Sequence, residues 1–474
     1  MPFVEIKSEV AQESVGLGSG TAPQAFKGPL QALQERFAVL DLGGELRLID
    51  REQVQSYFDG ERSGELSMYK KEAGDMKMKR YLEGLPLPVD ARKLVGEFWT
   101  SPITQWYDST AFTPRETPST TLNFWVGPTA KAKAGRWVVL RDYLRDVLCD
   151  GDEVVFDYLI KYLAHMVQRP GEKPGVMVVL LGDQGSGKGM FFNLLRSLWE
   201  QSAVLVSDIN HVTGQFNALL ERNYVIFLDE AVFAGDRRAL DRLKSTVTET
   251  RIQIEQKYQP SRTIESVHRF FAASNHEQFA HVEKSDRRFV FLRVSNIHLQ
   301  DTTYFGQIAQ AIADPVTMGA LLYYLKRKDI SHFNVRARPK TAEHLAQKLL
   351  SLEGVERWWY EVLMSGSLTG HDGGVAGTLE PFPVKWSDPM FVGTDWLVLK
   401  YKDFDKNAGR YKTVQAKAIQ TQLTKLCPSA QKGRHRCGDV GGESLQLRGI
   451  GLPTLASARR DFERVMGGWV DWDD

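Results

Sequence analysis

A buried strand, a glycine-rich loop and a helix follow one another between residues 176 and 198, and this succession restricts the possible folds more than any other feature. The apolar run Val176–Leu181 predicts the strand, and apolar residues from Phe191 to Leu198 recur at helical spacing. Glycines allow backbone N–H groups to turn inward around phosphate oxygens, and the N-terminus of a helix adds a favourable dipole. We therefore expect a nucleotide site in an α/β domain built on a parallel sheet, with a phosphate loop of Gly182, Asp183, Gln184, Gly185, Ser186, Gly187, Lys188 and Gly189.

Lys188 is expected to lie against the β- and γ-phosphates of the nucleotide. The residue after this lysine is normally Ser or Thr, whose hydroxyl binds Mg²⁺, whereas this chain has Gly189 followed by Met190. Two consequences are open. Either Asp229 and water hold the metal, or the site binds nucleotide more weakly.

The second part of the expected site follows the apolar segment Asn223–Leu228, which predicts a buried strand ending at Asp229 and Glu230. A carboxylate pair at the carboxyl end of a strand in an open α/β sheet lies in the ligand crevice. We expect Asp229 to hold Mg²⁺ and Glu230 to act as general base towards the attacking water, so ATP and Mg²⁺ are the expected cofactors. The alternative is an acidic pair that caps the next helix.

A third strand is predicted over His268–Ser274 and is followed by Asn275. An amide at a strand tip beside the phosphates can orient the hydrolytic water, although Asn after Ser is also an ordinary turn residue. Further along, Arg287 and Arg288 precede another predicted strand. An arginine here could complete the site of a neighbouring subunit as an arginine finger, and Arg288 is the preferred candidate. The alternative is an ion pair with Asp286.

A hairpin is predicted between the second and third strands. Ile252 and Ile254 alternate with polar residues as in a strand, and a turn carrying Lys257 and Tyr258 precedes a return strand. A cation and an aromatic ring at the tip of a hairpin suit contact with a DNA backbone. An exposed, solvated turn is the alternative.

In their order, these motifs resemble the superfamily 3 AAA+ helicases, and more closely the helicase part of phage, plasmid and poxvirus-type primase–helicases. The resemblance covers Asp142–Asn296 and implies an AAA+ P-loop ATPase core, a ring of six subunits, a DNA-tracking hairpin tip at Lys257 and Tyr258, and an inter-subunit finger at Arg288. It rests on the phosphate loop and on Lys188-Gly189, Phe216-Asn217, Leu243-Lys244 with Thr248-Glu249, and Asp286–Phe289.

The C-terminal part of the chain is locally basic. Thr413–Leu426 predicts a helix, a basic turn is expected after Pro428, and a strand over Leu445–Ile450 precedes a terminal helix from Leu455. Two helices followed by a basic wing are typical of a winged-helix DNA-binding domain, while a merely solvated charged surface is the alternative. The candidate DNA contacts are Lys417, Lys425, Arg434 and Arg436.

Two further groups in this part are discounted as metal sites. Asp403 and Asp405 have the spacing of a polymerase metal pair, but they sit among lysines in an expected helix without a third carboxylate. Cys427, His435 and Cys437 lack the paired short spacing of zinc modules.

The chain is divided into six expected parts. They are a flexible tail (1–27), an aromatic and proline-rich, loop-rich N-terminal module with short strands or helices (28–140), a helical collar with the ATPase core (141–330), a helical lid (331–364), a linker (365–383) and a winged-helix-like domain (384–474).

Composition restricts the location and the partners. The formal net charge is +1, so binding to nucleic acid must come from local patches rather than from a basic field over the whole molecule. Three cysteines indicate a reducing compartment, and no apolar run approaches the length of a membrane span. We expect a cytoplasmic protein without membrane contact, in the host cytoplasm if the chain is phage-encoded.

Two functional hypotheses follow. The first is an ATP-driven replicative DNA helicase of a phage or other mobile element, a homo-hexamer on single-stranded or forked DNA. The second is a replication initiator or loader that binds DNA and is switched by nucleotide without processive unwinding. We find no convincing polymerase carboxylates before the ATPase, so a separate primase or polymerase is an expected partner.

Overall fold

The computed structural model describes residues 28–58, 67–86, 88–230, 237–255, 261–284, 286–367, 386–440 without 408–414, and 443–472, and it leaves out the side chains of residues 407 and 435–447. The predicted tail (1–27), most of the predicted linker, and both Lys257 and Tyr258 lie outside these ranges. The chain forms two compact units, of which the first consists of residues 1–231, 238–275 and 292–338, and the second contains the rest.

The N-terminal part of the first unit is a small α/β module. Its four-stranded sheet has the order β3-β2-β1-β4, and β1 and β2 are joined by Gly43 and Gly44, whose φ angles of +68° and +94° suit a two-residue hairpin turn. Phe37 and Val39 of β1 pack into one apolar cluster and Ala38 and Leu40 into another, so both faces of the sheet are covered. The elements are α1 (Pro29–Arg36), β1 (Phe37–Leu42), β2 (Glu45–Asp50), α2 (Arg51–Phe58), β3 (Met68–Lys70), α3 (Lys71–Glu83), α4 (Ala91–Thr100) and β4 (Trp106–Tyr107).

The expectation of a loop-rich module is therefore wrong for residues 29–100, which are mostly regular. It holds for residues 108–137, where the only described strands are the short β5 (Ser109–Ala111) and β6 (Thr121–Asn123). Trp99 and Phe124 are buried, so both aromatic side chains belong to the core of this module.

A second sheet has five strands, and four of them, β7, β12, β9 and β8, form the centre of the first unit. Its strands have the order β13-β7-β12-β9-β8, and β7, β12, β9 and β8 pair in parallel. Every residue of β7, β12 and β9 is buried, as expected for parallel strands covered on both faces. The strands are β7 (Met177–Leu181), β8 (Ala203–Val206), β9 (Val225–Leu228), β12 (Arg269–Ser274) and β13 (Phe289–Arg293).

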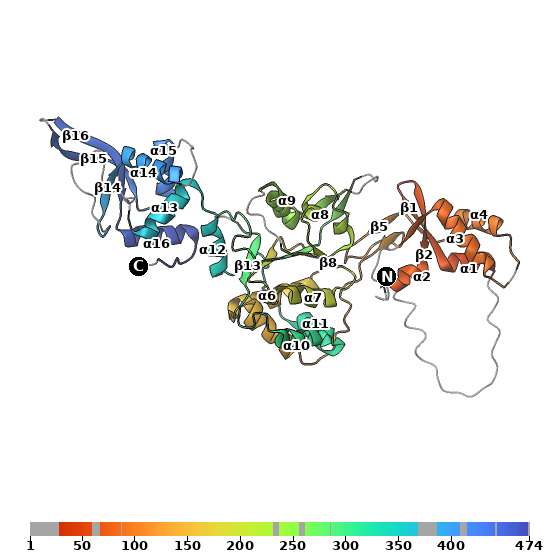
Figure 1. Cartoon of the computed structure of the whole chain (residues 1–474). Coiled ribbons are helices and arrows are strands. Elements are labelled where there is room, and N and C mark those ends of the chain that lie inside the picture. The colour runs from red at the N-terminus through yellow and green to blue at the C-terminus, as the bar shows by residue number, and fades with distance from the viewer. Residues whose placement is uncertain are drawn as a thin grey trace. The chain divides into compact units, whose positions relative to one another are not determined.

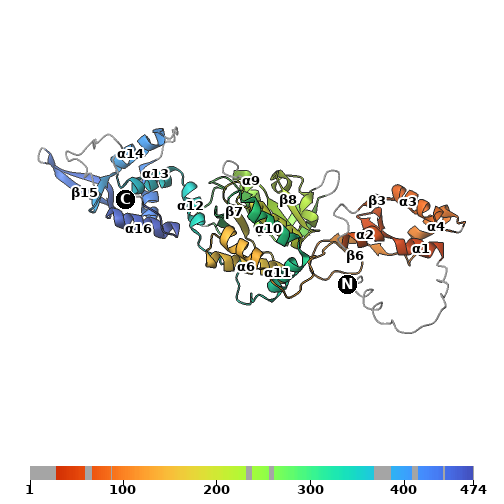
Figure 2. The same cartoon turned by 60° about the horizontal axis from the view of Figure 1, so that its bottom comes forward.

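Helices cover this sheet on both sides. In Figures 1 and 2, α9 lies on the side away from α6 and α11. Asp152 caps α6 by accepting hydrogen bonds from the N–H groups of Val154 and Val155. The helices are α5 (Val138–Asp142), the π-helix η2 (Tyr143–Leu148), α6 (Glu153–Gln168), α7 (Lys188–Leu198), α8 (Asn210–Thr213), the 3₁₀ helix η3 (Ala218–Arg222), α9 (Arg237–Thr248), α10 (Thr302–Ala313) and α11 (Pro315–Arg327). The expected α/β fold with a parallel sheet is thus present.

A buried arginine joins α6 to the amino end of this sheet. The guanidinium of Arg269 donates to the backbone carbonyls of Val267 (2.9 Å) and Arg169 (3.0 Å) and lies 5.1 Å from the ring centre of Tyr224. Because Arg169 follows the last residue of α6, this cation also lies at the negative end of the helix dipole. Burial and the Arg269 charge lower the pKa of His165 to about 4. Burial and the nearby Lys173 lower that of His268 to about 3.

These two histidines predict a loss of stability on mild acidification. An unfolded histidine titrates near pH ~6.5, so between pH 6.5 and 4 the unfolded chain binds protons that the folded chain excludes, and stability falls by about 1.4 kcal/mol per pH unit for each histidine. Urea unfolding at pH 7, 6 and 5 measures this slope. His268→Gln should reduce this slope by about 1.4 kcal/mol per pH unit. An unchanged slope in His268→Gln would contradict the assignment.

The second unit contains a helical layer and a three-stranded antiparallel sheet of order β14-β16-β15. Trp359, Trp386 and Trp396 are central in its apolar core. The elements are α12 (Ala342–Leu350), α13 (Gly354–Ser365), β14 (Met390–Gly393), α14 (Thr394–Asn407), α15 (Ala416–Leu426), β15 (Gln431–Val440), β16 (Glu443–Leu452) and α16 (Leu455–Met466).

One expectation in this unit is wrong. Much of the segment predicted as a basic turn after Pro428 is the ten-residue strand β15, which pairs with β16. Two helices followed by a β-hairpin agree with the order expected for a winged helix, and that assignment itself stays a prediction. Asp403 and Asp405 lie in α14 as expected, and Cys427 is buried with its thiol donating to Asp461.

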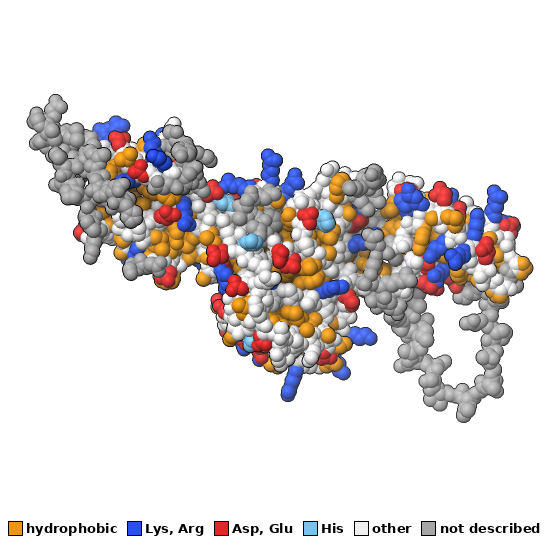
Figure 3. All heavy atoms as spheres, viewed as in Figure 1, with side chains coloured by type: hydrophobic (Ala, Val, Ile, Leu, Met, Phe, Trp, Pro, Cys, Tyr) orange, Lys and Arg blue, Asp and Glu red, His pale blue; other side chains and the backbone are white. Residues whose placement is uncertain are grey.

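The described surface carries charges of both signs. Acidic and basic side chains are interspersed over the face seen in Figure 3, in keeping with the net charge of +1. Among the described helices, none combines the length and the apolar character needed to cross a membrane.

Candidate nucleotide and nucleic-acid site

The phosphate loop connects β7 to α7, and its glycines are required by its geometry. Gly185 and Gly187 have φ angles of +86° and +98°, which disfavour any side chain. A Cβ atom on Gly187 would also come within 2.4 Å of the Phe305 ring, and one on Gly185 within 3.0 Å of the Gln300 side chain. The loop therefore turns tightly against the start of α10 and the segment before it.

Residues distant in sequence hold the loop in place. The Asn296 amide donates to the Asp183 carboxylate over 2.7 Å, the N–H of Gln300 donates to the Gly185 carbonyl over 3.1 Å, and the buried Tyr143 hydroxyl donates to the Gly187 carbonyl over 2.9 Å. These three residues were not predicted as part of the site. Each is an ordinary residue type in a segment without a motif, so no local signal marks it.

Lys188 lies inside the loop. Its ammonium donates to the carbonyls of Gly182 (2.6 Å) and Asp183 (2.7 Å) and is almost completely buried. Burial lowers the pKa of Lys188, and the carboxylates of Asp183, Asp229 and Glu230 oppose this by raising it. The acidic pair is thus close enough to Lys188 to act on its charge.

The tips of three strands meet at this edge of the sheet. Ser274 at the end of β12 pairs with Leu181 at the end of β7, and the N–H of Gly182 donates to the Ser274 carbonyl. Asn275 therefore follows directly beside the start of the phosphate loop. Leu228 at the end of β9 pairs with Ala272, so Asp229 and Glu230 lie at the same edge, one strand further on.

Glu230 has an unusual backbone conformation. Its φ angle is +52°, in the left-handed region that costs a non-glycine residue about 1–2 kcal/mol. Its N–H donates to the Asp229 carboxylate over 3.2 Å, and its side chain is exposed. Strain of this kind persists where the surrounding structure enforces it, and it is concentrated at functional sites.

The donor set suits a nucleoside triphosphate with Mg²⁺. The N-terminus of α7 and the loop N–H groups can receive phosphate oxygens, the Lys188 ammonium can neutralise their charge, and Asp229 offers a hard oxygen ligand for the metal. Gly189 is exposed on α7, and a Cβ atom there would meet nothing within 4 Å. Steric crowding therefore does not explain the missing hydroxyl.

Arg287 and Arg288 belong to the second unit. Arg287 is exposed and Arg288 is half-buried, and the Asp286 carboxylate accepts the backbone N–H groups of Arg288 and Phe289 at 3.2 Å. The Arg288 Nε is buried without a hydrogen-bond partner among the described residues. The Asp286 carboxylate thus accepts a hydrogen bond from the backbone of Arg288, whereas the predicted alternative was an ion pair between Asp286 and the Arg288 side chain.

The candidate DNA contacts are described only in part. Lys417 and Lys425 are exposed at eight-residue spacing on one face of α15, and Lys432 of β15 donates to Thr421 on that face over 3.0 Å. Arg434 is exposed on β15, while the side chain of Arg436 lies outside the description. Lys257 and Tyr258 also lie outside it, but the strands before and after them, β10 (Arg251–Ile254) and β11 (Arg262–Glu265), form the expected antiparallel hairpin.

Comparison with known proteins relates the chain to a phage protein. A family described as "Family of unknown function (DUF5906)" matches residues 180–288. The "DNA Primase-polymerase" of Nitratiruptor phage NrS-1 is 30% identical over 155 residues, which are 32% of this chain and 21% of that protein. The chain thus matches about a fifth of the length of this curated relative.

Solved structures of the NrS-1 C-terminal region (residues 305–718 of that protein) in apo form show the same fold. Two of them have TM-scores of 0.62 and 0.59 at 17% and 16% identity, and each match covers 90% of this chain and 99% of the other. The chain therefore shares the α/β fold of that region over nine-tenths of its length.

Proposed function

We propose that this chain is an ATP-dependent DNA helicase of a phage or related mobile element, which translocates on single-stranded DNA as a ring oligomer. The observation that carries the proposal is the arrangement of Lys188, Asp229, Glu230 and Asn275 around one phosphate-type loop. Lys188 would neutralise the phosphates, Asp229 would hold Mg²⁺, Glu230 would accept a proton from the attacking water, and Asn275 would orient that water.

The comparisons support a role in phage DNA replication. The relative with 30% identity is named a primase-polymerase and comes from a phage. A primase or polymerase is a proposed partner of this chain, forked or single-stranded DNA is the proposed substrate, and the host cytoplasm is the proposed location. The exposed lysines of α15 and the β10–β11 hairpin are the surfaces proposed to contact DNA.

The ring is proposed because hydrolysis needs a cation that stabilises the charge of the transition state. Arg287 is exposed, and Arg288 beside it is half-buried. We propose that Arg288, with Arg287 next to it, reaches the phosphates bound by a neighbouring subunit. A homo-hexamer is the proposed assembly.

ATP hydrolysis with and without single-stranded DNA is the experiment that tests this function. We expect turnover that DNA stimulates several-fold, together with ATP-dependent separation of a forked duplex. If DNA does not affect ATP turnover and the duplex is not separated, the proposal of an ATP-driven helicase is contradicted. Sequence-specific DNA binding in the absence of unwinding would support the second candidate, a nucleotide-switched initiator.

The specific observation that favours this second candidate is Gly189, because a site without the usual hydroxyl can bind Mg²⁺–ATP without efficient turnover. We expect Gly189→Ser to strengthen Mg²⁺-dependent ATP binding about three- to tenfold, or about 0.7–1.4 kcal/mol. The added hydroxyl has room and can bind the metal. ATP titrations with Mg²⁺ and with EDTA measure the effect.

Gly189→Ala is the matched control, because alanine fills the same space and improves the helix without supplying a hydroxyl. Equal affinities for ATP in the Ser and Ala variants would show that the position does not take part in metal binding.

A further inference from the structure

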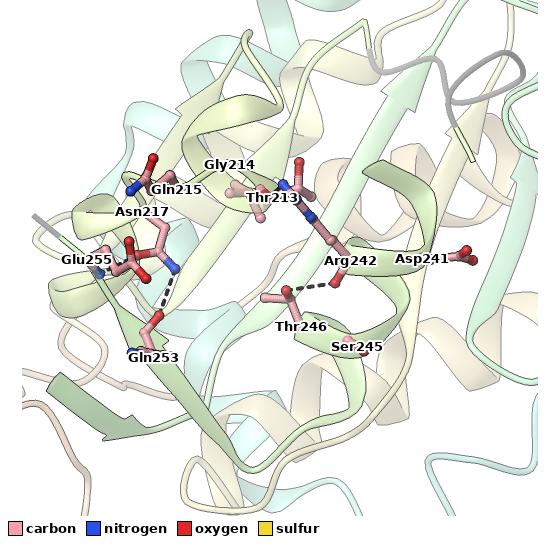
Figure 4. A pocket seen from close by; sticks show the side chains of 11 residues that line it. Thr213, Gly214, Gln215, Asn217, Asp241, Arg242, Ser245, Thr246, Gln253 and Glu255 are labelled. Atoms are coloured by element: carbon pink, nitrogen blue, oxygen red, sulfur yellow. Dashed lines mark hydrogen bonds between the residues drawn. The ribbon is translucent and has the colours of Figure 1, made fainter. Parts of the chain in front are cut away.

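Asn217 binds the hairpin strand β10 along its edge. Its side-chain amide donates to the Gln253 carbonyl over 2.9 Å and accepts the Glu255 N–H over 2.9 Å, while its own N–H donates to the Glu255 carbonyl over 3.3 Å. Figure 4 shows Asn217 pointing towards Gln253 and Glu255 at one wall of a polar groove, with α9 forming the other wall. The asparagine thus acts as a one-residue extension of the hairpin sheet.

The other strand of the hairpin is held from the same segment. Glu221, in the helix η3 that begins directly after Asn217, accepts a hydrogen bond from the Arg262 guanidinium at 2.5 Å. The Glu221 side chain is 18% exposed and the Arg262 side chain 36% exposed, so this pair is partly shielded from water. Residues 217–222 therefore bind β10 through an amide and β11 through an ion pair.

This segment is also fixed to the two strands whose tips carry candidate catalytic residues. The Leu220 carbonyl accepts a hydrogen bond of 2.6 Å from His268, which precedes β12, and the Leu220 side chain is fully buried. Asn223 donates to the Leu219 carbonyl over 2.8 Å, and β9 starts two residues later. Strand β9 ends next to Asp229 and strand β12 next to Asn275, so hydrogen bonds connect the hairpin to the amino ends of the two strands whose opposite ends carry these residues.

We propose that Asn217 is a positioning residue that couples the β10–β11 hairpin to the strands carrying Asp229 and Asn275. The proposal rests on the proposed function, since coupling has a purpose only if the hairpin meets a nucleic-acid strand. The chemistry needs asparagine, because one short side chain must donate to a carbonyl and accept an N–H at the same strand edge. Aspartate has the same shape but places a negative charge against the Gln253 carbonyl.

The test compares Asn217→Asp and Asn217→Ala with Gln215→Ala, a control that removes an exposed amide lining the same groove. Hydrogen–deuterium exchange of the full chain is followed in peptides covering the hairpin and in peptides covering the phosphate loop. We expect exchange at the hairpin to become at least tenfold faster in both Asn217 variants, with no change at the phosphate loop. Gln215→Ala should behave as the wild type in both peptides.

Enzymatic assays then distinguish a loss of coupling between the hairpin and the ATPase site from a general loss of folded protein. Basal ATP hydrolysis should stay within twofold of the wild type in the Asn217 variants, while stimulation by single-stranded DNA falls at least tenfold. Glu221→Gln removes the charge that binds β11, so it should also keep basal hydrolysis and lose stimulation by DNA. It serves as a second variant if Asn217→Ala folds poorly.

Unchanged exchange at the hairpin, or an equal loss of basal and stimulated hydrolysis, would overturn the proposal. If the wild-type chain itself shows no stimulation by DNA, the proposed function fails, and the exchange measurement still decides whether Asn217 anchors the hairpin.

Discussion

Replacing Lys188 with alanine is expected to reduce ATP hydrolysis about 10²- to 10³-fold, the usual cost of removing one pre-positioned donor that stabilises developing charge. The ammonium of Lys188 lies within the loop, bonded to the Gly182 and Asp183 carbonyls, and the acidic pair after β9 acts on its charge. Alanine removes the only cation that the described loop itself provides. Binding of ATP should weaken as well, because the phosphates lose their direct partner.

Arg196→Ala is the control for this substitution. It removes a cation from the exposed face of the same helix, so it tests for a general effect of charge near the site. Its hydrolysis should stay within twofold of the wild type. The measurement is steady-state phosphate release, with circular dichroism to show that both variants are folded. Full activity of Lys188→Ala would remove the loop from the proposed mechanism.

The central sheet could be predicted from the sequence because its signals are local. Strands β7 and β9 are continuous apolar runs, and β12 has the apolar centre Phe270–Ala273. Each strand leads into the phosphate loop or into polar residues that suit ligand binding or a turn. The rule that ligands bind at the carboxyl ends of parallel strands then brings Lys188, Asp229 and Asn275 to one edge. The sequence does not predict that β12 lies between β7 and β9, since that order depends on packing between distant segments.

Other parts were missed for identifiable reasons. The β1–β2 hairpin does have a local signal, a Gly43-Gly44 pair between two six-residue strands, but the prolines after residue 101 dominated the interpretation of the module. Strand β15 pairs only with β16 at the edge of its sheet, so its sequence lacks the apolar alternation of a half-buried strand. Tyr143 and Asn296 support the phosphate loop from 44 and 113 residues away, and no pattern of residues marks such contacts.

Substituting Glu230 should separate nucleotide binding from hydrolysis. In Glu230→Gln the side chain keeps its size but cannot accept a proton, so we expect ATP binding within a few-fold of the wild type and turnover reduced about 10²-fold or more. Glu200→Gln, an exposed carboxylate after α7, is the matched control. Equilibrium binding of ATP and single-turnover hydrolysis together measure the two effects. Normal turnover in Glu230→Gln would assign the general base elsewhere.

Glu230→Gly distinguishes the strain at this position from its chemistry. Glycine adopts the φ of +52° without the penalty that a side chain incurs, although it loses more backbone entropy on folding. The gain from relieved strain exceeds the entropy loss, so we expect Glu230→Gly to be about 1 kcal/mol more stable than Glu230→Gln in urea unfolding, while turnover is reduced about 10²-fold or more in both variants. A glycine variant that is more stable but deficient in hydrolysis shows that the strained backbone at Glu230 serves to position the carboxylate for hydrolysis. If the glycine variant is no more stable than the glutamine variant, the backbone at this residue is unstrained, and strain then gives no argument for a catalytic role of Glu230.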